Sequence, residues 1–175
     1  MSGISIISGT DREGSRTAQV ANAIRVMLEE KGIASDVLDL RHLPRDLDQL
    51  GLYGKESPVM QAVIARHIDP YDKLLFVIPE YNGGFPGMLK LFIDAIPPRR
   101  FHGKQAALVG VSDGHAGNLR GLDHFQAILN YLRVDVLWLK PKLSSVDRLL
   151  DANGAITDER AIRQLNDLVA LLAKR

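Results

Sequence analysis

Residues 4–17 read ISIISGTDREGSRT, and this stretch decides how the chain begins to fold. Its first four residues belong to an apolar run, and a pattern of helical periodicity follows it. Gly9 and Gly14 are separated by four residues, which is the spacing of a phosphate-binding loop between a strand and a helix. The lysine that a nucleoside triphosphate requires next is replaced by Ser15. The stretch is therefore better suited to one terminal phosphate, as in a mononucleotide.

Apolar runs alternate with helical patterns along the whole chain. Runs rich in Ile, Val and Leu predict buried strands over 3–8, 35–40, 73–78, 105–111 and 133–139. Helical patterns cover 15–31, 57–69, 86–96, 118–132 and a last segment that opens at Thr157, the expected N-cap. Continuously apolar strands are typical of a parallel sheet covered on both faces. We predict a single flavodoxin-like domain over 1–175, an α/β three-layer sandwich whose five-stranded parallel sheet has the order 2-1-3-4-5.

The composition excludes several classes of function. Lys and Arg number 22 against 21 Asp and Glu, a balance that argues against a nucleic-acid partner. The chain has no cysteine, so redox chemistry requires a bound cofactor, and the five histidines show no metal-ligand spacing. We expect no metal site. No apolar run is long enough to span a membrane and no signal peptide is visible, so we expect a cytoplasmic protein without a membrane partner.

Polar loops follow the first, third and fourth strands, whose carboxyl ends are the ligand edge of such a sheet. The first loop contains three hydroxyls and two guanidinium groups, on Thr10, Ser15, Thr17, Arg12 and Arg16. They suit an anion at a helix N-terminus, although an ordinary turn with Ser15 as N-cap explains the same residues.

The second and third loops read PEYNGGFPG (79–87) and SDGHAGN (112–118). Tyr81 can lie along an aromatic ring, and adjacent glycines allow the backbone to approach a flat ligand. Each loop alone is equally consistent with an ordinary glycine-rich turn. The coincidence of three such loops at one edge favours a ligand site. Segments 41–56 and 140–156 show no chemical constellation, and we expect them to shape the rim or an oligomer contact.

The stretches SGTDREGSRT, PEYNGGFPGMLKLFIDAI and GVSDGHAGNLRG resemble, in order and spacing, three motifs of the NADPH-dependent FMN reductase family. This resemblance implies a flavodoxin-like fold that holds FMN non-covalently. It also implies NADPH or NADH as electron donor, a quinone, flavin or similar small molecule as acceptor, and a homodimer or homotetramer.

The resemblance also implies roles for individual residues. The 5′-phosphate would be held at Thr10, Arg12, Ser15 and Thr17, with Arg16 among them. The isoalloxazine would be lined by Pro79, Glu80, Tyr81, Asn82 and Gly83, and closed on its other side by Ser112, Gly114 and Gly117. Departures from the family pattern include Gly83, where a larger residue is common, and Asn118, where a second glycine is usual. They bear on the flavin potential and on the pocket for the second substrate.

The expected mechanism assigns no catalytic side chain, because the cofactor performs the chemistry. A single open face of the ring would bind donor and acceptor in turn, giving ping-pong kinetics. Three alternatives remain: an electron carrier without NAD(P)H turnover, a flavin-binding sensor or scaffold, and a serine hydrolase using the GVSDG elbow at Ser112. The hydrolase would need a histidine in the last fifty residues, and none is there.

Overall fold

The structure is a computed structural model that describes residues 3–46, 49–52 and 57–174. The principal strands are β1 (Ile4–Ser8), β2 (Ser35–Asp39), β3 (Lys73–Pro79), β4 (Gln105–Val111), β5 (Asp135–Val136) and β6 (Lys142–Leu143). The α-helices are α1 (Arg16–Glu30), α2 (Pro58–His67), α3 (Gly87–Asp94), α4 (Leu119–Tyr131) and α5 (Glu159–Lys174). Short 3₁₀ turns occupy η1 (Leu40–His42), η3 (Pro98–Arg100) and η4 (Val146–Arg148).

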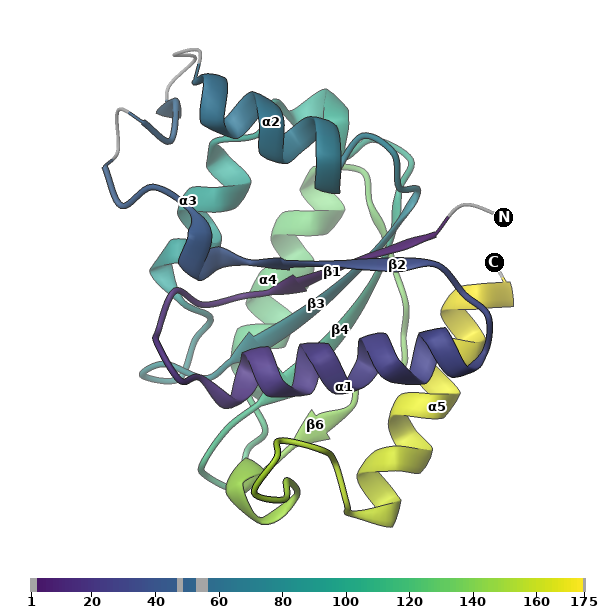
Figure 1. Cartoon of the computed structure of the whole chain (residues 1–175). Coiled ribbons are helices and arrows are strands. Elements are labelled where there is room, and N and C mark those ends of the chain that lie inside the picture. The colour runs from purple at the N-terminus through teal and green to yellow at the C-terminus, as the bar shows by residue number, and fades with distance from the viewer. Residues whose placement is uncertain (1–2, 47–48, 53–56, 175) are drawn as a thin grey trace.

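The sheet is parallel, and its order β2-β1-β3-β4-β5 confirms the predicted topology. Helices α2, α3 and α4 cover one face, while α1 and α5 cover the other (Figure 1). Alternate residues of each central strand enter the two cores: Phe76 packs with α3 and α4, and Leu75 packs with α1 and α5. This two-sided burial explains why the strands are continuously apolar.

The edge beyond β4 differs from the expectation of one continuous strand over 133–139. β5 pairs Val136 with Ala106, and β6 pairs Lys142 with Gly110. Between these two pairs, β4 has three residues (107–109), whereas the edge segment has five (137–141). The two extra residues of the edge segment form an outward bulge. Trp138 in this bulge is 74% exposed.

The start of the last helix also differs from the prediction. Asp158 supplies the N-cap, since its Oδ1 accepts the Ala161 N–H at 2.8 Å, whereas the Thr157 hydroxyl contacts the carbonyl of Leu149 at 3.5 Å. An aspartate is at least as good an N-cap as a threonine and also complements the helix dipole. Among the described helices, none is long and apolar enough to cross a membrane.

Candidate flavin site

A cavity of about 360 Å³ opens at the carboxyl ends of β1, β3 and β4. Its wall comes from three predicted loops and from the segment after β6: Arg12, Glu13, Gly14, Ser15, Arg16, Thr17, Pro79, Glu80, Tyr81, Val111, Ser112, Asp113, Val146 and Asp147. β1 and β3 are neighbours in the sheet, while their connections run to opposite faces. The cavity therefore lies where a doubly wound sheet binds its ligand.

The first loop turns into α1 at Ser15, which is the helix N-cap. Its Oγ accepts the Ala18 N–H at 3.3 Å, as the ordinary-turn interpretation required. Gly14 has φ +63°, so the chain turns through a left-handed residue just before the helix. The first N–H groups of a helix have no intrahelical acceptor, and here the first two helical residues, Arg16 and Thr17, line a cavity. Capping and anion binding are thus compatible at this helix end.

The first and second loops are joined by a hydrogen bond between the side chains of Thr10 and Tyr81. The two hydroxyl oxygens lie 2.8 Å apart, and Thr10 is fully buried. The same Thr10 oxygen accepts the backbone N–H of Arg12 at 3.3 Å. Thr10 therefore does not line the cavity. It is buried beneath the wall and connects the two loops that form it.

The two arginines of the first loop differ in their surroundings. The side chain of Arg12 makes no ion pair with the described residues and is exposed at the cavity wall. Arg16 donates from Nε to Asp147 Oδ1 at 2.5 Å and from Nη1 to Gln19 at 3.1 Å. A phosphate in the cavity would therefore compete with Asp147 for Arg16.

Asn82 and Gly83 form a tight turn. Their φ values are +51° and +79°, and Tyr81 and Gly84 exchange two backbone hydrogen bonds across them. Two consecutive positive φ angles define a type I′ turn, for which Asn-Gly is the preferred pair. The positive φ of Gly83 favours glycine over a larger side chain at this position.

The third loop is held by the hydroxyl of Ser112. This hydroxyl donates to the carbonyl of Gly114 at 2.8 Å and accepts the Gly117 N–H at 3.0 Å. Within the described part of the chain, no hydrogen bond joins Ser112 to a histidine. Its role in fixing the loop leaves the serine-hydrolase alternative without structural support.

The cavity gathers most of the residues predicted to hold the cofactor. Eight line it, namely Arg12, Ser15, Arg16, Thr17, Pro79, Glu80, Tyr81 and Ser112, whereas Thr10, Asn82, Gly83, Gly114 and Gly117 stand outside the wall. Six other lining residues were not assigned. Glu13, Gly14, Val111 and Asp113 adjoin predicted ones, whereas Val146 and Asp147 were missed because 140–156 carried no recognisable motif. The sequence gives only an indirect signal for these residues. A polar segment that follows the expected last strand lies at the same sheet edge as the three loops, and it can therefore contribute to the site.

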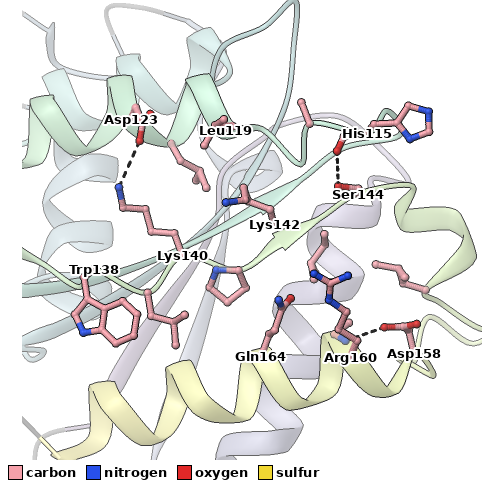
Figure 2. A pocket seen from close by; sticks show the side chains of 17 residues that line it. His115, Leu119, Asp123, Trp138, Lys140, Lys142, Ser144, Asp158, Arg160 and Gln164 are labelled. Atoms are coloured by element: carbon pink, nitrogen blue, oxygen red, sulfur yellow. Dashed lines mark hydrogen bonds and ion pairs between the residues drawn. The ribbon is translucent and has the colours of Figure 1, made fainter.

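A larger cavity of about 790 Å³ lies between the N-terminal half of α4, the bulged edge and the start of α5. Figure 2 shows Trp138 at its rim and Lys140 directed toward Asp123, 3.5 Å away. Its wall includes none of the predicted cofactor residues. It lies beside the sheet edge, outside the ligand-binding position of the fold, and we do not assign it to the cofactor.

Fold and cavity together define a doubly wound α/β protein with a polar cavity at the carboxyl edge of its sheet, the position where such folds bind mononucleotides. Residues 3–138 match the family model of NADPH-dependent FMN reductases. The chain belongs to the NADPH-dependent FMN reductase family, and it is an FMN-dependent NAD(P)H oxidoreductase.

Individual relatives agree with this assignment. An NAD(P)H-dependent FMN reductase of Pseudomonas aeruginosa is 34% identical over 89% of this chain and 84% of its own length. A 2-hydroxy-1,4-benzoquinone reductase of a Burkholderia species is 30% identical over 89% and 86%. The structure of the flavoenzyme FerB, an NAD(P)H:acceptor oxidoreductase of Paracoccus denitrificans, superposes with a TM-score of 0.83 at 22% identity, covering 99% and 96% of the two chains, which shows the shared fold.

Proposed function

We propose that this enzyme holds FMN in the cavity at the ends of β1, β3 and β4, and that reduced FMN passes its electrons to a quinone. The observation that carries the placement is the meeting of the three loops with the N-terminus of α1 around one cavity. The quinone is suggested by the relatives named for quinone reduction.

The chemical groups on this wall fit the two ends of FMN. The α1 N-terminus, the hydroxyls of Ser15 and Thr17 and the exposed Arg12 suit a phosphate. The wall formed by Pro79, Glu80 and Tyr81 offers backbone groups and one aromatic ring to a flat ligand. Bound FMN supplies the ring that takes a hydride from the nicotinamide and passes electrons on.

The protein's part in this reaction is to bind and orient. We assign no general acid or base, because no proton needs to be held by a side chain for hydride transfer between two rings. Ser112 and Gly117 fix the third loop, and Tyr81 fixes the second loop to the first through Thr10. The fixed loops would hold the ring with one face open, so that donor and acceptor bind in turn.

The test is a visible spectrum of the purified protein, followed by anaerobic addition of NADPH or NADH and then of benzoquinone. We expect a flavin spectrum, bleaching by the nucleotide without another protein, and recovery of the oxidised spectrum on adding the quinone. A protein that binds FMN but is not bleached would be an electron carrier or sensor. A protein that cannot be reconstituted with FMN would refute the proposal.

The homodimer or homotetramer expected from the family resemblance, and the cytoplasmic location, stay predictions. Light scattering on the eluting protein would measure the oligomer directly, and a monomeric mass would contradict the first of them.

A further inference from the structure

Asn118 precedes α4 and is fully buried, although its side chain does not cap that helix. Its Nδ2 donates to the carbonyls of Ile78 and Pro79, both at 3.0 Å, where β3 ends. Its backbone N–H donates to Glu80 Oε2, also at 3.0 Å. One residue of the third loop therefore holds three consecutive residues, 78–80, where β3 passes into the second loop.

The backbone and the neighbouring helix both accommodate this arrangement. Asn118 has φ +63°, a left-handed conformation that asparagine tolerates better than most residues other than glycine. Position 121, inside α4, is glycine, and a Cβ there would lie 2.1 Å from Asn118 Oδ1. Glycine inside a helix is destabilising, so the space reserved for the Asn118 side chain has a cost.

The link made by Asn118 reaches the whole cavity wall. Glu80 and Tyr81 line the cavity directly after the two carbonyls that Asn118 holds. Tyr81 in turn is hydrogen-bonded to Thr10 of the first loop. The three loops are thus joined in series, third to second through Asn118 and second to first through Tyr81.

We propose that Asn118 is a positioning residue for the cofactor: its amide fixes the wall of Pro79, Glu80 and Tyr81 in the shape that FMN requires before FMN binds. The inference rests on the proposed placement of FMN in this cavity. A wall already ordered in the free protein loses less conformational freedom on binding, so pre-organisation appears as affinity. The usual family glycine at this position cannot provide the amide.

The informative variant is Asn118→Gly, because glycine tolerates the left-handed backbone and only the amide is lost. We expect apoprotein carrying N118G to bind FMN about tenfold more weakly, the fold-change equivalent to about 1.4 kcal/mol. We also expect faster hydrogen exchange at the amides of Glu80 and Tyr81, which donate to Val111 and Gly84. FMN affinity is read from the quenching of flavin fluorescence.

Two control variants separate positioning from general stability. Arg133→Gly places glycine at another left-handed residue (φ +59°), beyond the far end of α4, and tests the backbone change alone. Lys104→Met removes a buried amine that donates to Ile68 and Tyr71 carbonyls at the opposite end of the sheet, and lowers stability without touching the cavity. Both controls should keep FMN affinity within about twofold of the wild type, as surface and distant changes usually do.

The possible outcomes decide between the two proposals. If N118G binds FMN as tightly as the wild type, the positioning role of Asn118 is refuted. The role is also refuted if K104M, at the same unfolding free energy as N118G, loses as much FMN affinity. If N118G does not fold, exchange in the wild-type apoprotein decides: free exchange at Glu80 and Tyr81 would show that the wall is not pre-organised. Wild-type protein that binds no FMN would instead refute the placement of the cofactor.

Discussion

Asp147 gives the sharpest test of how the phosphate is held. Its carboxylate accepts from Arg16 Nε at 2.5 Å across the cavity, in a segment that no motif marked. If FMN binds as proposed, a phosphate at the N-terminus of α1 would be attracted by Arg16 and repelled by Asp147, which both line the cavity. We therefore predict that Asp147→Asn tightens FMN binding, although it removes an ion pair.

The size of this effect follows from the exposure of the pair. The side chains of Arg16 and Asp147 are 45% and 62% exposed, so their attraction is worth about 0.2 to 1 kcal/mol after screening by water. Asparagine keeps the size and one acceptor oxygen but removes the charge. Releasing Arg16 and removing the repulsion should contribute about 0.5 to 1 kcal/mol to binding, a two- to fivefold lower Kd. Because the effect is electrostatic, it should shrink at high salt.

The assay is a titration of apoprotein with FMN, followed by flavin fluorescence at low and at high salt. Asp167→Asn is the matched control, since it makes the same charge change on α5, which contributes nothing to the cavity wall. An unchanged Kd for D147N would mean that Arg16 does not contact the phosphate. A weaker Kd would mean that Asp147 holds Arg16 in place for it, and either result refutes the competition argued above.

Three further predictions concern single contacts. Tyr81→Phe removes the hydrogen bond between Tyr81 and Thr10, which is worth about 1 kcal/mol. The same titration should therefore show about fivefold weaker FMN binding. An unchanged Kd would contradict the link between the first and second loops. Gly117→Ala would set a Cβ 2.5 Å from the Cβ of Lys142 in β6, at φ +58°. Such overpacking costs about 1–3 kcal/mol, so the thermal unfolding midpoint should fall by roughly 2–12 °C, and an unchanged midpoint would contradict the close packing of this loop. Burial lowers the pKa of His67 below 6.5 despite the neighbouring Asp36, so the unfolded chain takes up the proton first. Stability should be fully present above about pH 6.5 and decline as the pH falls through that value toward the lowered pKa, a decline that His67→Gln should reduce in urea unfolding curves.

The central strands could be predicted because their residues are buried on both faces, so composition reports their environment. The sheet order could be predicted because right-handed crossovers between five βα units leave few topologies. The edge could not. Residues 133–139 are as apolar as a strand, but the pairing of Val136 with Ala106 and of Lys142 with Gly110 depends on backbone register, which hydrophobicity does not encode.

The site was predictable in part for a similar reason. Residues next to β1, β3 and β4 were found because the topology brings the ends of these strands together. Asp147 enters the wall from the short segment directly after β6, and its partner Arg16 is 131 residues earlier. Asn118 was visible only as a departure from a glycine. The two carbonyl groups that accept from its side chain are about forty positions earlier in the sequence, so only the folded structure identifies them.

The bulge beyond β4 also affects how copies of this chain can meet. A regular strand at the edge of a sheet offers unpaired N–H and C=O groups on which a second molecule can extend the sheet. Here that edge is divided into two pieces of two residues each, separated by the outward turn at 137–141, with Pro141 and the exposed Lys142 beside it. Growth by strand addition is disfavoured at this border, which protects against fibrous aggregation. The opposite border, β2 (Ser35–Asp39), is a regular strand that pairs, among the described strands, only with β1, so the protection belongs to the β5–β6 side of the sheet alone.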